Sequence, residues 1–267
     1  MRPFRCLRCD LIFLHPPLTE QEERDFYRSQ FRETYHGADY DIDAFHRRGR
    51  GEARRRAMHL ERSHRLSGDV LEVGSATGYF LEEASRCEAV HSATGVELDD
   101  RQRHYARSQG LRCVRELEEL GEARFDLIVL FHVLEHIGQP VDFLRELRAR
   151  LRAGGAIVVE VPNVEDALLS VYKIEAFRRF YWHPAHRVYF SKDTLSETAR
   201  RAGLTAVVDP LQRYSLSNHL HWATRGAPGG ERWLTHMIDA DTERSYTRDL
   251  CRAFVCDTLW MTAQPEQ

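Results

Sequence analysis

The sequence predicts an α/β fold in which helices cover both faces of a mostly parallel β-sheet. Apolar segments of strand length alternate with amphipathic helical segments from residue 68 onward. The apolar segments carry few polar residues, as expected for strands that are buried on both faces. Glycine or proline marks most of the junctions between them. With 267 residues, of which 42% are hydrophobic, the chain is long enough to bury one large core.

The first half of the alternation begins at Gly68. Asp99 and Asp100 mark a helix start, because carboxylates at an N-terminus complement the helix dipole. In order, we expect a strand at 70–73, a turn at 74–78, a helix at 79–86, a strand at 91–98, a helix from 99 to 110 and a short strand at 112–114.

The second half continues the pattern with one interruption, at 164–190, which is dense in aromatic residues and histidine. Gly154 and Gly155 are expected to stop a helix, and Ser191 to cap the next one. The expected elements are strands at 125–131, 156–161, 204–208 and 257–261, and helices at 140–151, 191–202 and 229–250.

Residues 1–67 are predicted to be an N-terminal extension, and residues 68–267 a single α/β domain. The extension begins with a short extended piece that contains Cys6 and Cys9, and continues with helical stretches. Its arginine-rich run at 47–65 could contact phosphate, but a solvated helix face is the better interpretation.

Composition excludes several classes of protein. Lys and Arg number 38 against 41 Asp and Glu, so the chain lacks the basic character of a nucleic-acid-binding protein. No apolar run reaches the roughly 18 residues of a membrane span. Six cysteines in a chain of this length do not indicate a disulfide scaffold. We therefore expect a cytoplasmic protein that binds neither membranes nor nucleic acid.

A glycine-containing turn joins the first strand to the first helix and is followed by an acidic residue. The turn runs from Glu72 through Gly74 to Gly78, and Glu97 ends the next strand 23 positions after Gly74. This is the spacing at which a carboxylate accepts hydrogen bonds from a ribose diol. Glu72 would repel a pyrophosphate but suits a cationic ligand with an amino group. The pattern therefore favours S-adenosylmethionine over a nicotinamide dinucleotide.

Four segments together resemble the class I S-adenosylmethionine-dependent methyltransferases. They are VLEVGSATGYF at 70–80, TGVE at 94–97, FDLIVLFHVLEH at 125–136 and LRAGGAIVV at 151–159. The resemblance covers about residues 68–163 and implies a Rossmann-like, mostly parallel sheet of seven strands. It also implies S-adenosylmethionine as cofactor and S-adenosylhomocysteine as product.

The same resemblance implies roles for individual residues. Around the methionine part of the cofactor it places Gly74, Ser75, Ala76 and Gly78, with Glu72 near the amino group. Glu97 would hold the ribose hydroxyls, Leu98 would pack on adenine, and Phe131 and His132 would face the sulfonium. Ala76 stands where the family usually has glycine, and its methyl group narrows the approach. The alternative is that the glycines only form a tight turn and Glu97 is a surface carboxylate.

The acceptor side is indicated by a second resemblance. Residues 182–191 resemble a segment of methyltransferases that act on sugars and secondary metabolites. It makes His186 the first candidate for a general base, with His136 and His132 as competitors. Tyr181, Trp182 and Tyr189 could present their faces to a sugar ring or be ordinary core. Asn218 lies in a polar, aromatic stretch that we place near the acceptor pocket.

The sequence thus predicts transfer of a methyl group to a hydroxyl or carbon of a small polar acceptor, a sugar or natural-product intermediate. Cys6 and Cys9 resemble half of the zinc ribbon found in some sugar methyltransferases, and no bound metal is predicted. Association into a homo-oligomer is left open. The alternatives are a non-catalytic subunit that keeps the fold and a nucleotide-dependent oxidoreductase. A nucleic-acid methyltransferase is weaker still, since residues 131–134 lack an Asn/Asp-Pro-Pro-Tyr/Phe motif.

Overall fold

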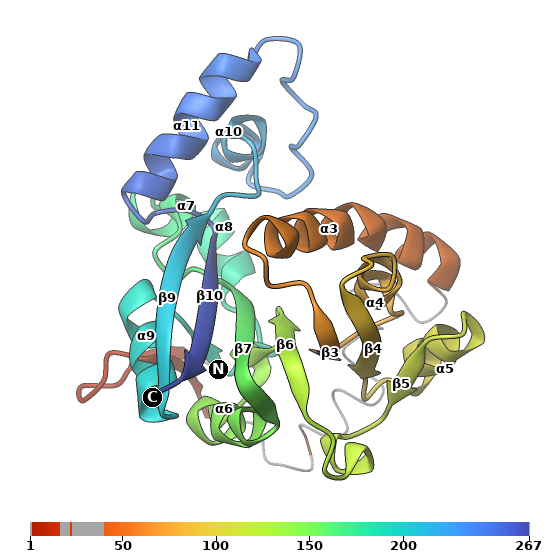
Figure 1. Ribbon diagram of the computed structural model, residues 1–267. Helices are drawn as coiled ribbons and strands as arrows, with labels where there is room; N and C mark the ends of the chain where they lie inside the picture. Colours follow the sequence, from red (N-terminus) through yellow and green to blue (C-terminus); the bar gives the residue numbers. More distant parts are fainter. Residues whose placement is uncertain (1, 17–21, 23–39, 267) are drawn as a thin grey trace.

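A sheet of seven strands forms the centre of the computed structural model, which describes residues 2–16, 22 and 40–266 (Figure 1). The strands are β3 (Gly68–Val73), β4 (Val90–Val96), β5 (Arg112–Val114), β6 (Phe125–Phe131), β7 (Leu151–Pro162), β9 (Leu204–Leu211) and β10 (Thr258–Pro265). Their order is β5-β4-β3-β6-β7-β10-β9. The strands from β5 to β7 are parallel, whereas β10 runs antiparallel to β7 and β9. The predicted Rossmann-like α/β fold is confirmed.

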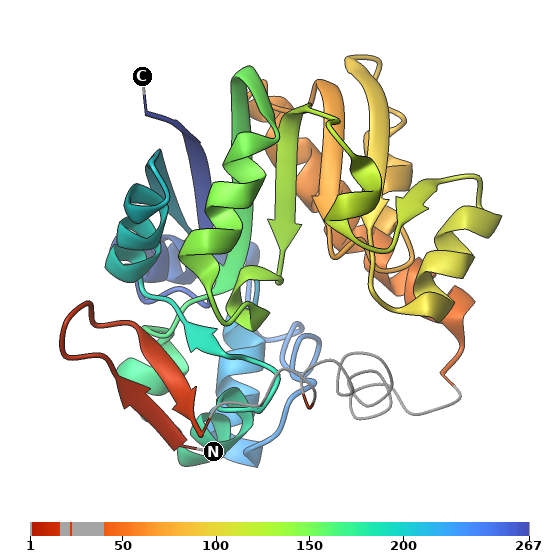
Figure 2. The same ribbon diagram turned by 90° about the horizontal axis from the view of Figure 1, so that it is seen from below.

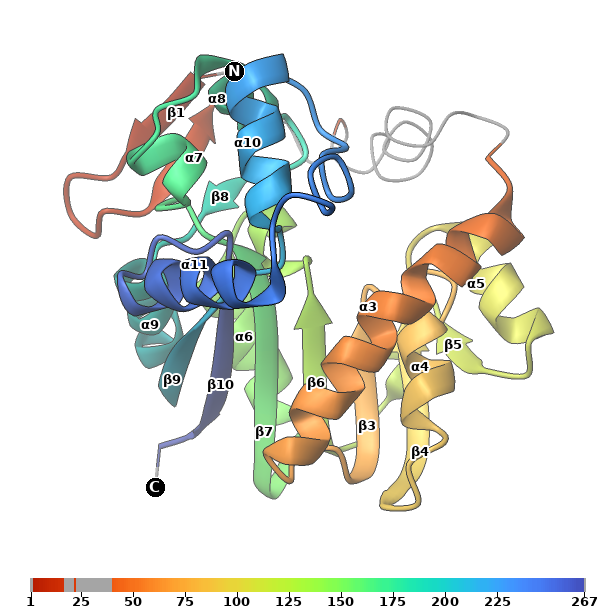
Figure 3. The ribbon, with the colours of Figure 1, turned by 90° about the horizontal axis from the view of Figure 1, so that it is seen from above.

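Helices cover both faces of the sheet, because alternate side chains of its strands point to opposite sides. In β6, Leu127 and Val129 join the apolar cluster beneath α3 (Ile42–Arg62) and α4 (Tyr79–Ala84). Ile128 and Leu130 join the cluster beneath α6 (Pro140–Ala149) and α9 (Lys192–Arg201). Figure 2 shows α6 in front of the sheet, and Figure 3 shows α3 crossing the other face.

Helix starts follow the predicted caps. Asp99 accepts a hydrogen bond from the backbone N–H of Gln102 at the start of α5 (Asp100–Ser108), and Ser191 caps α9. The expectation that Gly154 and Gly155 stop a helix is wrong. The helix ends at Ala149, and both glycines lie inside β7, where the register against β6 shifts.

The C-terminal region differs from the prediction of one helix at 229–250. Residues 229–239 are not helical, and α11 (Ala240–Arg252) begins after its N-cap, Asp239. A separate helix that the sequence analysis does not predict, α10 (Leu216–Arg225), precedes the Pro228-Gly-Gly sequence that interrupts the helical pattern.

A second, smaller sheet joins the N-terminus to the interruption at 164–190. Its strands are β1 (Arg2–Arg5), β2 (Ile12–His15) and β8 (Val188–Tyr189), in the order β1-β2-β8. Leu14 of β2 packs with residues of α7 (Ala167–Ser170), α8 (Glu175–Tyr181) and α10 in a third apolar cluster. Helix α3, which precedes residue 67, packs against α4, which follows it. The division of the chain into two parts after residue 67 therefore stays a prediction.

The arginine-rich run lies on α3, and two of its members turn inward. Arg55 and Arg56 both bind the carboxylate of Glu160 in β7, and Arg56 is 4% exposed. The interpretation of the run as a solvated face is therefore wrong for these two arginines. Within the residues that the structure describes, no helix is both long and apolar enough to span a membrane. The cytoplasmic location stays a prediction.

Asp166 provides a pH-dependent test of the fold. It caps α7 from a position that is 2% exposed. Burial raises its pKa to about 7, despite a hydrogen bond from the N–H of Leu168, and nearby Asp257 raises it further. Because the folded pKa exceeds that of the unfolded chain, this carboxyl lowers stability progressively as the pH rises from about 4 to about 7.

We expect Asp166→Asn to be more stable than the parent at pH 8, by on the order of 2 kcal/mol, with the difference vanishing near pH 4. Urea unfolding at both pH values measures this, and an equal difference at both would contradict it.

Candidate active site

The turn between β3 and α4 has a left-handed backbone at three of its five residues. Gly74, Ala76 and Gly78 have φ angles of 73°, 50° and 79°. The φ of Gly78 favours glycine there, and a Cβ atom at this position would also force Cδ1 of Leu111, 2.5 Å away, to shift. Ala76 adopts a conformation that is unusual for a residue with a Cβ atom. Its N–H donates to a carboxylate oxygen of Glu97 at 2.8 Å, which stabilises this shape.

Glu97 follows directly on β4, the strand next to β3, so its side chain reaches the same edge of the sheet as the turn. Its two carboxylate oxygens accept hydrogen bonds from the backbone N–H groups of Ala76 and Asp99, each at 2.8 Å. The residue is 7% exposed, which rules out the alternative of a surface carboxylate. Leu98, beside it, is 51% exposed.

Glu72 lies two residues before the turn and is 2% exposed. Its Oε2 atom is buried without a hydrogen-bond partner. Burial raises the pKa of its carboxyl well above the ordinary value; Arg56 opposes this shift, and Glu97 adds to it. A buried carboxylate oxygen without a partner is costly, and a ligand with an ammonium group would relieve that cost.

Gly74 tests how tightly the turn is packed. A Cβ atom there would lie 2.5 Å from Cγ2 of Val133, whose β-branched side chain has little freedom to move. We expect Gly74→Ala to lower the free energy of unfolding by roughly 2–3 kcal/mol, through backbone strain and the clash. Gly110→Ala is the matched control, because Gly110 has a φ of 79° and nothing within 4 Å. Equal losses in the two variants, measured by urea unfolding, would show that the contact with Val133 is unimportant.

The chain leaves β6 through His132, which has a φ of 57°. Its ring nitrogens lie 3.2 Å from carboxylate oxygens of Glu135 and Glu160, and Nε2 lies 2.9 Å from Arg213. Burial and Arg213 disfavour the imidazolium, but the hydrogen bonds to the two carboxylates outweigh them and raise the pKa of His132. Phe131, by contrast, packs against other aromatic rings, so its side chain is part of the core.

Glu160 is the centre of a buried charged cluster that the sequence analysis missed. Its fully buried carboxylate binds Arg55, Arg56 and Arg213. Burial opposes ionisation, but His132 and the arginines hold the pKa of Glu160 well below its ordinary value. The available signal was a glutamate within the apolar strand AIVVEV, since a charge in a buried strand requires a partner.

The structure brings together His136 and His186, the two leading candidates for the general base. His136 ends the short 3-10 helix η3 (Leu134–His136), and its ring centre lies 4.9 Å from that of His186. His183 lies 3.8 Å from His186 by the same measure. Burial, reinforced by these neighbouring imidazoles, holds the pKa of His186 well below its ordinary value. His186 is therefore neutral at pH 7.

The predicted acceptor residues fall into two groups. Tyr181, Trp182 and Tyr189 pack against one another, with ring centres 4.6–5.5 Å apart, in agreement with the core alternative. Trp182 and Tyr189 also line a cavity of about 600 Å³ that extends to Arg178. Asn218 is 3% exposed on α10 and donates a hydrogen bond to Glu231, which links α10 to the loop that follows it.

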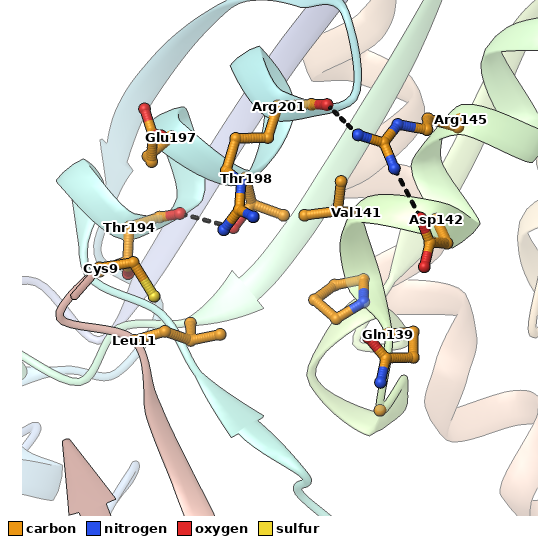
Figure 4. Close-up of a pocket in the computed structure, with 12 residues that line it drawn as sticks. Cys9, Leu11, Gln139, Val141, Asp142, Arg145, Thr194, Glu197, Thr198 and Arg201 are labelled. Carbon is orange, nitrogen blue, oxygen red and sulfur yellow. Dashed lines mark hydrogen bonds and ion pairs between the residues drawn. The ribbon is translucent and has the colours of Figure 1, made fainter. Parts of the chain in front are cut away.

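A further pocket, of about 380 Å³, lies between the N-terminal hairpin, α6 and α9 (Figure 4). Cys9 and Leu11 line one side of it, and Thr194 and Thr198 line another. Its lining includes no residue of the turn at 74–78, and none of His136, His183 and His186. Cys6 and Cys9 lie on the hairpin, and the described part of the chain brings no third His, Cys, Asp or Glu to them as a metal ligand.

The strand order with β10 antiparallel, the left-handed turn and the acidic residue after the next strand define the class of S-adenosylmethionine-dependent methyltransferases. A family model described as a methyltransferase domain matches residues 45–208. The chain belongs to this family, and the prediction of a methyltransferase is confirmed at that level.

Individual relatives differ in what their names say they act on. A ubiquinone biosynthesis O-methyltransferase of Cereibacter sphaeroides is 27% identical over 58% of this chain and 66% of that protein. A tRNA U34 carboxymethyltransferase of Pseudoalteromonas translucida is 30% identical over 36% of this chain and 32% of that protein. The chain thus spans from about one third to just under two thirds of these relatives.

Solved structures agree on the fold. The DhpI-SAM-HEP complex covers 93% of this chain and all of its own, with a TM-score of 0.55 and 16% identity. Magnesium protoporphyrin IX methyltransferase from Synechocystis, crystallised with S-adenosylhomocysteine, has the same coverages and TM-score at 12% identity. At these identities the likeness shows the fold alone.

Proposed function

We propose that this protein transfers a methyl group from S-adenosylmethionine to a hydroxyl or carbon of a small polar acceptor, a sugar or natural-product intermediate. The observation that carries the cofactor side is the pair of buried carboxylates around the Gly74 turn. Glu72 offers an unpartnered oxygen to the amino group, and a carboxylate such as Glu97 can accept hydroxyl donors in addition to its two backbone N–H groups. Ser75, Ala76 and Gly78 would line the methionine part, and Leu98 would pack on adenine.

Polar atoms without partners support a polar acceptor beside the histidines. The Tyr181 hydroxyl, the Trp182 indole N–H and Nδ1 of His186 are all buried without hydrogen-bond partners. Each of these side chains packs against the ring of Tyr189, so the three residues belong to one cluster. An acceptor that carries several hydroxyl groups would satisfy them, which favours a sugar-like compound over an apolar one.

The residues would mainly position the reactants, because methyl transfer is an in-line displacement at carbon. When bound, S-adenosylmethionine supplies a methyl carbon that leaves its sulfonium sulfur with the bonding pair remaining on sulfur. The acceptor provides the pair for the new bond and gives up a proton. His186 is neutral and partly buried and is our first candidate to take that proton, with His136 next to it. His132, held between Glu135 and Glu160, would border the sulfonium side.

Calorimetric titration of the full chain with S-adenosylhomocysteine tests the cofactor side, with NADH as the control. We expect saturable binding of S-adenosylhomocysteine and none of NADH. Absence of binding by the folded chain would overturn the proposal in favour of a non-catalytic protein that keeps the fold. Binding of NADH alone would point instead to an oxidoreductase.

A further inference from the structure

Three side chains with metal-binding atoms meet beside the proposed acceptor region. Glu135 and His136 are consecutive in η3, and His186 comes from the segment that precedes β8. One ligand atom from each lies within 4.8 Å of those of the other two. The N–H of Arg187 donates to the carbonyl oxygen of Glu135 at 2.8 Å, so the backbone itself holds the two segments together.

Two of these side chains have buried polar atoms without a partner. Glu135 is 1% exposed; its Oε1 lies 3.2 Å from Nδ1 of His132, but its Oε2 has no hydrogen-bond partner. Nδ1 of His186 is likewise buried and unpartnered. Leaving two such atoms unsatisfied in one cluster costs free energy, and a bound cation would remove this cost.

The third side chain is oriented as metal-binding histidines commonly are. Nδ1 of His136 lies 2.8 Å from the carbonyl oxygen of Ala185. A carbonyl oxygen can only accept, so Nδ1 carries a proton, and in the neutral ring Nε2 carries the lone pair. A backbone carbonyl that fixes the tautomer and ring orientation in this way is a frequent second partner of a ligand histidine.

We propose that Glu135, His136 and His186 bind one divalent transition-metal cation of the Zn²⁺ type. Two imidazoles and one carboxylate suit Zn²⁺, Co²⁺ or Mn²⁺, whereas Mg²⁺ and Ca²⁺ prefer oxygen ligands alone. Three protein ligands leave at least one coordination position open to a further molecule. This proposal departs from the sequence-based prediction of no bound metal.

The cation would act on the acceptor, and this consequence rests on the proposed function. The cluster follows Val133, which contacts the Gly74 turn, so it adjoins the proposed cofactor site. An acceptor hydroxyl in the open position would have a lower pKa and would lose its proton to solvent more readily. His186 would then be a metal ligand, and the cation would replace it in activating the acceptor.

The test is titration of the chelator-treated full chain with Co²⁺, followed by visible absorption and by calorimetry. Cys6 and Cys9 are first replaced by serine, so that their thiols cannot contribute. His186→Ala in this background is compared with His104→Ala, which removes an exposed histidine of α5. We expect one Co²⁺ per chain in the parent and the His104 variant, and an affinity lower by at least about 100-fold in the His186 variant.

S-adenosylhomocysteine binding and urea unfolding are recorded for every variant to show that it is folded. If His186→Ala does not fold, His136→Gln takes its place with the same expectation. Failure of the parent to bind stoichiometric Co²⁺, or unchanged affinity in the folded His186 variant, overturns the metal site. Co²⁺ binding without any binding of S-adenosylhomocysteine would uphold the metal site and overturn the proposed function.

Discussion

Replacing Glu160 by glutamine is expected to lower the free energy of unfolding by about 3–5 kcal/mol, the cost of removing one partner from a buried ion pair. The carboxylate is fully buried in β7 and binds Arg55, Arg56 and Arg213. Without it, the guanidinium groups of Arg56 and Arg213 lose their shared counter-charge. Urea unfolding at pH 7 measures the loss.

Glu52→Gln is the matched control, because Glu52 also pairs with Arg55 but at a half-exposed position. Exposed ion pairs contribute roughly 0–1 kcal/mol, so the control should stay within that range. A loss below about 1 kcal/mol in the Glu160 variant would mean that the arginines find other partners or water. The ion pairs of Glu160 would then contribute little to the stability of the packing of α3 on the sheet.

Replacing Glu97 by alanine is expected to weaken binding of S-adenosylhomocysteine by about 1–3 kcal/mol, which corresponds to roughly 5–150-fold in Kd. Two effects combine in this variant. The proposed hydrogen bonds to the ribose hydroxyls are lost, and the N–H groups of Ala76 and Asp99 lose their acceptor, which loosens the turn.

Glu97→Gln separates the two effects, since its amide oxygen can still accept one backbone hydrogen bond while the charge is gone. Glu122→Ala, at an exposed position, controls for the loss of a carboxylate elsewhere. Calorimetric titration gives Kd for each variant. An unchanged Kd in Glu97→Ala, with the chain folded, would remove Glu97 from the proposed cofactor site and leave it a structural role only.

The turn at 74–78 and the acidic residue after β4 could be predicted from the sequence because their signals are local. A left-handed backbone selects glycine at a fixed position, and the strand-turn-helix pattern of residues 70–84 places that turn at the carboxyl edge of the sheet. The same holds for the helix caps at Asp99 and Ser191, where a side chain binds a backbone N–H three residues away.

Helix α10 could not be predicted with the same success. Ser215 caps this helix, but the sequence analysis expected the helix of this region only after Pro228, at 229–250. Phe131 and Tyr189 show the same limit. A strand-end aromatic can face a ligand or the core with equal propensity, and the decision depends on which rings other elements bring against it.

The α/β fold and the position of the glycine turn could be inferred from the sequence, because each depends on periodicity or on spacing within about 30 residues. The methyltransferase class was indicated by the resemblance of four segments to that family. The tertiary structure was needed to show that Arg56 meets Glu160 from 104 residues away, and that Glu135 and His136 meet His186 from about 50 residues away. A local pattern can show that Glu160 needs a partner, but it does not show which distant residue is that partner. A buried charge is stable only beside a partner, and the packing of α3 against β7 brings Arg56 to Glu160.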